Sequence, residues 1–107
     1  MFSVMKNRIV ITGLGILAPN GKGRREYWDA LRQGIPGYRN VSLFKTDEFL
    51  VHTGGEVPGF DASVYMGKKG LRNLDRSSLL LVSASKLTLA NSRFEVTKKN
   101  TTECGVS

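Results

Sequence analysis

The sequence predicts an α/β fold that this chain completes only in part. A run of β-branched apolar residues, Ile9 to Ile11, indicates a strand buried on both faces. Apolar residues at helical spacing indicate a short helix over Arg24 to Gln33 and a long helix over Asp75 to Asn91. The long helix is apolar around its whole circumference, and a chain of 107 residues has little other material to cover it. We therefore expect further protein around these elements.

The composition is that of one ordinary globular domain. Of the 107 residues, 40% are hydrophobic, and no stretch of about 18 uninterrupted apolar residues is present that would span a membrane. The N-terminus lacks the apolar core of a secretory signal, so we expect a cytoplasmic protein with no membrane association. The single cysteine, Cys104, excludes an internal disulfide and a cysteine-based metal site.

The first expected element is the strand from Arg8 to Thr12. It leads into Gly13-Leu14-Gly15 and, three residues later, Ala18, which is the G-x-G-x-x-A spelling of a dinucleotide-binding loop. Such a loop needs a helix that starts within the motif and an acidic residue about 20 positions further on. Residues 19–23 instead indicate a loop, and residues 33–40 offer neither a strand nor an acid. We therefore expect no cofactor, and glycines that let the chain turn sharply and pack closely against neighbouring backbone.

Local signals define the next elements. The helix over residues 24–33 is followed by Gly34, which stands where a C-terminal cap is needed. Residues 35–66 hold turns and weak periodicity, with one possible short strand near Gly55 to Val57. We expect this region to be mostly irregular.

The long helix has a clear start, because Asp75 can accept backbone N–H bonds from the first turn. After a polar stretch, residues 103–107 indicate the beginning of another strand. A strand cut at its start leaves backbone groups unpaired. We therefore expect residues 1–107 to be the front piece of a longer protein.

A series of short motifs runs along nearly the whole chain. It starts with Val10 to Gly15 and ends with Cys104 to Val106. Between them lie Pro19, Gly21, Trp28, Leu31, Gly34, Gly37, Phe44, Asp47, Phe49, Gly55, Glu56, Val57, Phe60, Asp61, Tyr65, Met66, Leu74, Asp75 and Arg76. In this order and spacing, the series resembles the opening of the β-ketoacyl-acyl carrier protein synthases, the condensing enzymes of fatty acid and polyketide synthesis. Three places depart from the family pattern: Leu74 replaces a usual methionine, Ala18 a frequent serine, and the basic run Lys22 to Arg25 is unusual.

The resemblance implies a thiolase-like α/β fold of layered sheets and helices (αβαβα), of which residues 1–107 form the N-terminal portion of the first half. It implies a decarboxylative Claisen condensation of an acyl thioester with malonyl-carrier protein. The implied partners are acyl carrier protein and a second copy in a homodimer, and no cofactor is expected. The family's catalytic cysteine and two histidines lie beyond the last residue of this chain. We therefore expect the segment alone to be inactive.

A basic cluster, Lys68, Lys69 and Arg72, precedes the long helix. Basic clusters often belong to a solvated face. In the elongating synthases that the sequence resembles, however, basic residues just before this helix help to dock the acidic carrier protein, and Lys69 and Arg72 match those positions. Asn73 departs from a further basic residue there. We expect the cluster to bind carrier protein by electrostatic steering, and Arg76 to orient the helix start.

Two residue types that often act in catalysis occur once each, and neither is expected to be catalytic. A reactive thiol needs a cation, a helix N-terminus or a paired base, whereas Cys104 follows Glu103 and has no histidine nearby in the sequence. By its place in the resemblance it is a strand residue, so we expect a small buried side chain. His52 matches neither family histidine, and we expect a partly exposed structural role for it.

Two alternative functions remain open at this stage. The resemblance also fits a synthase-like subunit without condensation chemistry, such as a chain-length factor, and only the downstream cysteine and histidines separate the two. The net charge of +7, from 16 Lys and Arg against 9 Asp and Glu, also allows a nucleic-acid-binding module. The chain lacks an aromatic-basic surface, an RNA motif and a zinc framework, so we expect no nucleic-acid partner.

Overall fold

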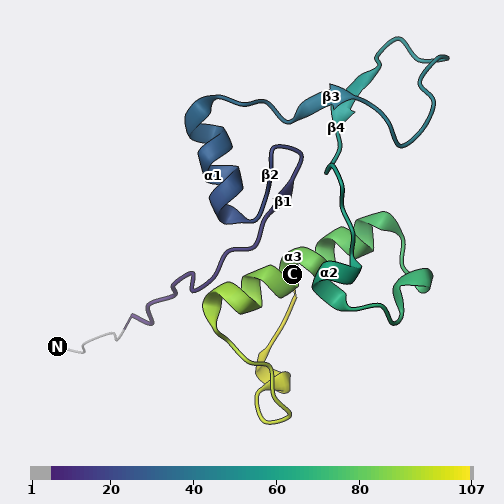
Figure 1. Ribbon diagram of the computed structural model, residues 1–107. Helices are drawn as coiled ribbons and strands as arrows, with labels where there is room; N and C mark the ends of the chain where they lie inside the picture. Colours follow the sequence, from purple (N-terminus) through teal and green to yellow (C-terminus); the bar gives the residue numbers. More distant parts are fainter. Residues whose placement is uncertain (1–5, 107) are drawn as a thin grey trace.

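The computed structural model describes residues 6–106 as an open, elongated molecule (Figure 1). Its radius of gyration is 18.4 Å, against about 13 Å for a compact domain of this length. Its accessible surface is 9608 Å², against about 5,900 Å² for a compact monomer of this mass. In chain order the elements are β1 (Leu17–Ala18), β2 (Gly21–Lys22), α1 (Arg24–Gln33), β3 (Tyr38–Asn40), β4 (Thr53–Gly55), α2 (Ser63–Met66), the 3₁₀ helix η1 (Leu71–Asn73), α3 (Arg76–Ser92) and the 3₁₀ helix η2 (Thr101–Glu103).

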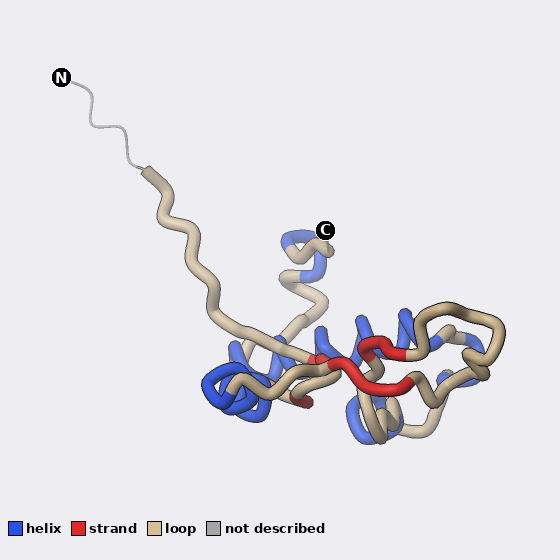
Figure 2. The backbone as a smooth tube through the Cα atoms, turned by 90° about the horizontal axis from the view of Figure 1, so that it is seen from above, coloured by secondary structure: helices blue, strands red, loops and turns tan. Residues whose placement is uncertain are grey.

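The expected buried strand over Arg8 to Thr12 is not formed, and that prediction is wrong for this structure. The segment runs as an extended arm away from the rest of the molecule (Figure 2), with Ile9 96% exposed and Ile11 84% exposed. Within residues 6–106, no strand pairs with this arm. The apolar run favours an extended backbone, but a strand also needs a neighbour that exchanges backbone hydrogen bonds with it.

Two short antiparallel hairpins replace part of the expected irregular structure. Strands β1 and β2 pair across a two-residue turn, Pro19-Asn20, with Ala18 opposite Gly21. Strands β3 and β4 pair with Arg39 opposite Gly54 and are joined by a loop over residues 41–52. The strand expected near residues 55–57 is therefore present, two residues earlier than predicted.

Helix α1 has the predicted bounds. Gly34 adopts the left-handed conformation (φ 67°, ψ 27°), and its N–H donates to the carbonyls of Ala30 and Leu31. Ala30 is buried, whereas Trp28 is 60% exposed and Leu31 50% exposed. The apolar face that defines this helix is therefore only partly covered within the described residues.

Helix α3 confirms the predicted long helix, shifted by one residue. Asp75 is its N-cap, and the Asp75 carboxylate accepts a hydrogen bond of 2.7 Å from the Ser78 backbone N–H. The helix ends at Ser92 and is followed by Arg93 in the left-handed conformation. Within α3 only Ser83 is buried, because the described residues cover a small part of its apolar circumference.

The glycine pair of the opening motif packs directly against α3. A methyl group on Gly13 would lie 2.6 Å from the Thr88 carbonyl oxygen, and one on Gly15 would lie 2.2 Å from the Ala84 carbonyl oxygen. Between them, the Leu14 N–H donates to the Asn91 side-chain oxygen at 3.0 Å. The expected close packing against backbone is confirmed. The expected sharp turn is not made at these glycines, since neither has a positive φ.

The structure mixes α and β elements as predicted, but residues 6–106 do not form the layered αβαβα arrangement. Their sheets are two separate two-stranded hairpins. Among these residues, the buried apolar side chains are Ala30, Val57 and Ala62. The small core explains why so many apolar side chains stay exposed.

The strand expected over residues 103–107 is also not formed. Residues 101–103 make η2, and Cys104 to Val106 follow as irregular backbone. Cys104 is exposed, so the expectation of a buried side chain is wrong within this structure. As with the N-terminal arm, no neighbouring strand is present among the described residues. Ser107 lies outside the described residues.

Candidate functional site

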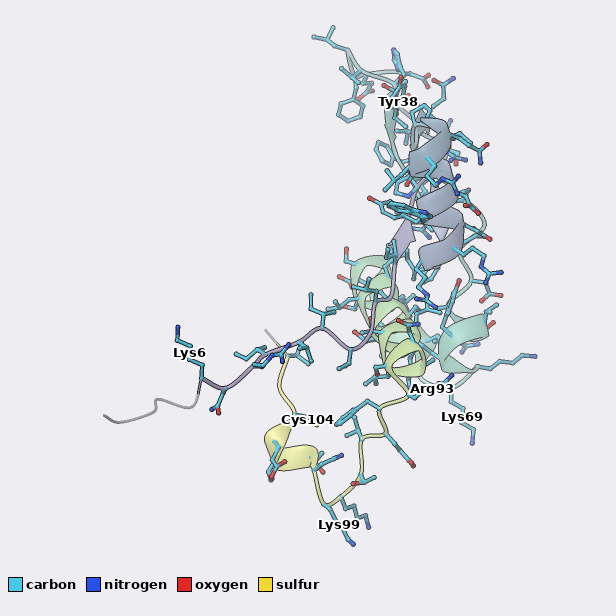
Figure 3. The ribbon with its side chains drawn as sticks, turned by 90° about the vertical axis from the view of Figure 1, so that its left-hand side faces the viewer. Lys6, Tyr38, Lys69, Arg93, Lys99 and Cys104 are labelled. Atoms are coloured by element: carbon cyan, nitrogen blue, oxygen red, sulfur yellow. The ribbon has the colours of Figure 1, made fainter. Side chains whose placement is uncertain are left out.

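The basic cluster lies on residues 67–73, which connect α2 to the start of α3 and are called the basic loop below. Its three cationic side chains, Lys68, Lys69 and Arg72, are exposed, and Lys69 projects away from the ribbon (Figure 3). Gly67 (φ 75°) and Gly70 (φ 79°) adopt positive φ values that other residues avoid. These two glycines shape a loop that presents its positive charge to solvent.

Asp61, just before α2, is an acidic residue whose titration is influenced by the basic loop. Its carboxylate accepts a hydrogen bond of 2.9 Å from the Ser63 backbone N–H. Hydrogen bonds from the Ser63 hydroxyl and backbone N–H, assisted by the positive charge of Lys68, hold the pKa of Asp61 below its usual value. All three cationic side chains of the basic loop stay exposed and accessible to an acidic partner.

Arg76, the first residue of α3, contacts the segment that precedes α2. Its guanidinium donates to the Val57 carbonyl oxygen at 3.1 Å and lies over the Phe60 ring, 5.5 Å from the centroid. The Phe60 ring stacks in turn on Tyr65 of α2, with centroids 6.1 Å apart and an interplanar angle of 22°. The expected structural role of Arg76 at the helix start is consistent with these contacts. We call Arg76, Phe60 and Tyr65 the stack.

Glu56 stabilises the β3–β4 hairpin near the stack by hydrogen bonds with residues 42 and 43. Its carboxylate accepts hydrogen bonds from the backbone N–H groups of Ser42 and Leu43, each at 2.9 Å, and from the Ser42 hydroxyl at 2.8 Å. The Leu43 N–H, the Ser42 hydroxyl and N–H, and the charge of Arg76 together hold the pKa of Glu56 below its usual value.

The residues considered for catalysis lie apart from this site. The His52 ring nitrogen Nδ1 lies 3.0 Å from the Thr46 hydroxyl oxygen on the loop over residues 41–52, and His52 is exposed. Cys104 lies beyond η2. Within residues 6–106 no group of three or more His, Cys, Asp or Glu side chains is placed to hold a metal ion. In the same part of the chain, the helices are too short or too polar to cross a membrane.

Apolar hollows open on the surface at some distance from the basic loop. One, of about 580 Å³, lies between residues 14–16 and α1; it is lined by Leu14, Ile16, Arg24, Arg25, Tyr27, Trp28 and Leu31. A second, of about 390 Å³, lies between α3 and the C-terminal segment and includes Phe94, Val96 and Val106. Exposed apolar surface of this kind marks places where other protein normally packs.

Sequence comparison matches nearly the whole chain to one protein family. Residues 6–107 match the family model described as "Beta-ketoacyl synthase, N-terminal domain". The 3-oxoacyl-[acyl-carrier-protein] synthase 2 of Vibrio cholerae is 36% identical over 102 residues, which are 95% of this chain and 25% of that protein. The tetracenomycin polyketide synthase ketoacyl synthase beta subunit of Streptomyces glaucescens is 37% identical over 98 residues, 92% of this chain and 24% of that protein. The chain therefore spans about a quarter of the length of the curated relatives it matches.

A solved structure has the same arrangement of elements. The ishigamide ketosynthase/chain length factor superposes on 80% of this chain with a TM-score of 0.75 and 29% sequence identity, and the match covers 21% of that chain. The open form of residues 6–106 is thus similar to one portion of a larger molecule.

Proposed function

Because the chain belongs to the β-ketoacyl synthase family, we propose that it forms the opening part of a β-ketoacyl-acyl carrier protein synthase. The observation that carries this proposal is the match of residues 6–107 to the N-terminal domain of that family. In the proposed reaction, an acyl chain passes from its carrier to an enzyme cysteine, and malonyl-carrier protein loses carbon dioxide. The resulting carbanion attacks the enzyme thioester, which releases the cysteine and leaves a β-ketoacyl product on the carrier.

In this proposal the nucleophilic cysteine and both histidines come from protein outside residues 1–107. That protein would complete the layered thiolase-like fold, pair with the arm over residues 8–12 and cover the hollow beside α1. The exposure of Ile9, Ile11 and Trp28 supports this role, since each is apolar and more than half exposed here. The complete synthase is proposed to act as a homodimer.

We propose that the basic loop docks the acyl carrier protein. Its support is the exposure of Lys69 and Arg72 on a loop that also carries the exposed Lys68. A positive patch of this kind raises the rate of encounter with an acidic protein, and salt weakens the effect. The same surface would serve acyl-loaded and malonyl-loaded carrier, because it recognises the carrier and not its cargo.

A charge-reversal variant tests the docking proposal. It is made in the natural polypeptide, by which we mean the complete protein that contains residues 1–107. Lys69→Glu combined with Arg72→Glu should raise KM for acyl-carrier protein about tenfold and leave kcat nearly unchanged, because the change acts on encounter and not on chemistry. Lys98→Glu combined with Lys99→Glu is the matched control, since it makes the same change in net charge at another exposed basic pair. An equal rise in KM in both variants would mean that only the net charge of the protein matters. That result would contradict the proposal that the basic loop is the docking site.

A second candidate function has its own support. One relative is named as a ketoacyl synthase beta subunit, and the similar solved structure is named as a ketosynthase/chain length factor. The complete protein would then be an inert partner that pairs with an active synthase. The two candidates differ in whether the purified protein forms an acyl thioester on its own cysteine when it is mixed with acyl-carrier protein.

A further inference from the structure

We propose that the stack of Arg76, Phe60 and Tyr65 is a positioning device that holds the basic loop in the shape needed to dock the carrier protein. The inference rests on the proposed docking function of this loop. It assigns Arg76 a role that differs from those of Lys69 and Arg72: Arg76 acts through the loop and does not touch the carrier.

The stack joins the two ends of the basic loop. Phe60 precedes α2, Tyr65 lies within α2, and Arg76 opens α3, so the contacts at 5.5 Å and 6.1 Å connect the element before the loop with the element after it. The hydrogen bond from Arg76 to the Val57 carbonyl oxygen, at 3.1 Å, adds a second connection at the same place. Figure 1 shows the loop leaving α2 and returning to α3 beside it.

Residues 67–70 of the loop supply little stiffness of their own, and residues 71–73 form the short 3₁₀ helix η1. Gly67 and Gly70 both adopt positive φ, and glycine has more backbone freedom than any other residue. Without fixed ends, Lys69 and Arg72 would have to be ordered when the carrier binds. Fixing the ends in advance lowers this ordering cost, which strengthens binding without adding any contact to the partner.

The charge of Arg76 is engaged within the chain, in contrast to that of Lys69. The Arg76 guanidinium lies over the Phe60 ring and donates to the Val57 carbonyl oxygen. The Arg76 side chain is therefore held by contacts within the chain, whereas Lys69 makes no such contact among the described residues. This difference separates a positioning residue from a docking residue in an experiment.

Carrier binding measured over a range of salt concentrations provides the test, with the natural polypeptide and acyl carrier protein as the probe. Phe60→Leu keeps an apolar side chain and the net charge but removes the ring. It should raise Kd about fivefold at every salt concentration and leave the salt dependence unchanged. Arg76→Lys, which keeps the charge but loses the planar guanidinium, should have the same effect. Lys69→Gln should instead flatten the salt dependence.

Phe44→Leu is the matched control, because Phe44 forms a separate edge-to-face pair with Phe49 on the β3–β4 loop, with centroids 6.3 Å apart. Phe44→Leu should leave Kd unchanged.

Circular dichroism shows whether each variant is folded. If Phe60→Leu does not fold, the test rests on Arg76→Lys alone. Wild-type Kd in folded Arg76→Lys would overturn the positioning role. If Lys69→Gln and the wild type bind carrier equally, the docking function itself fails.

Discussion

Gly15 lies so close to Ala84 that the two backbones are almost in contact: a methyl group on Gly15 would stand 2.2 Å from the Ala84 carbonyl oxygen. The same methyl would meet the Thr88 backbone nitrogen at 2.5 Å. The motif that resembles a dinucleotide-binding loop is thus a contact between an extended segment and the backbone of a long helix. Glycine is required there because no side chain fits.

Gly15→Ala should therefore destabilise the protein by about 2 kcal/mol or more, since the added methyl meets backbone that cannot move away cheaply. The free energy of unfolding in urea measures the change. Gly105→Ala is the matched control, because nothing lies within 4 Å of the position of its added methyl. Equal stability of the two variants would show that the segment over residues 13–15 does not rest on α3 in solution.

Acid should weaken the parts of the fold that carry the basic loop. The pKa values of Glu56, Asp61 and Asp75 are each held below their usual values, mainly by hydrogen bonds from Leu43 and Ser42, from Ser63 and from Ser78, respectively. A carboxyl group whose folded pKa is depressed contributes stability above its unfolded pKa, near 4, and that contribution is lost as pH falls through the folded pKa.

The corresponding variant is Glu56→Gln. The midpoint of thermal unfolding of the wild type should fall as pH drops below about 4, and the fall should be smaller in Glu56→Gln because one of the three groups no longer titrates. Thermal scans between about pH 2.5 and 6 provide the measurement. A variant whose curve runs parallel to that of the wild type would contradict the assigned hydrogen bonds of Glu56.

Ser83 offers a test of the assembled core. Its side chain is fully buried, and its hydroxyl oxygen has no hydrogen-bond partner among the described residues. Burying an unpaired hydroxyl costs free energy, so Ser83→Ala should leave the stability unchanged or raise it by roughly 1 kcal/mol. Ser85→Ala is the control on the same helix, since the Ser85 hydroxyl donates to the Leu81 carbonyl oxygen at 2.9 Å. A large loss of stability in Ser83→Ala would reveal a partner for that hydroxyl in the complete protein.

Cys104 should be dispensable for the proposed condensation. It is exposed within the described residues, and the proposed chemistry uses another cysteine. Cys104→Ser should therefore retain the condensation activity of the natural polypeptide within about twofold. Mass spectrometry after incubation with acyl-carrier protein is a second readout, because an acyl group found on Cys104 would contradict its assignment.

Local signals in the sequence were sufficient to predict the two main helices. Gly34 ends α1 through its left-handed conformation, and Asp75 starts α3 through a hydrogen bond three residues away. Both signals act within one helical turn, so they do not depend on the rest of the protein. The strands over residues 8–12 and 103–107 are different, because a strand requires a partner that is distant in sequence.

The candidate site could be predicted only in part. Lys69 and Arg72 were selected from the family resemblance, because they match positions that help to dock the carrier protein there, and their docking role stays a prediction. The stack was missed, since Phe60 and Arg76 are far apart in sequence and no local pattern joins them. Strands β1, β2 and β3 were missed because strands of two or three residues are too short for an alternating pattern, although Pro19-Asn20 gave a turn signal. Strand β4 was predicted near its observed place, without its partner.

The central claim is that residues 1–107 belong to a condensing enzyme. Its most direct test is to incubate the natural polypeptide with acyl-carrier protein and malonyl-carrier protein and to analyse the carrier-bound products by mass spectrometry. The account predicts a β-ketoacyl-carrier protein two carbons longer than the starting acyl chain, with one carbon dioxide released per product. Carrier binding without any such product would contradict the claim and favour the inert partner subunit.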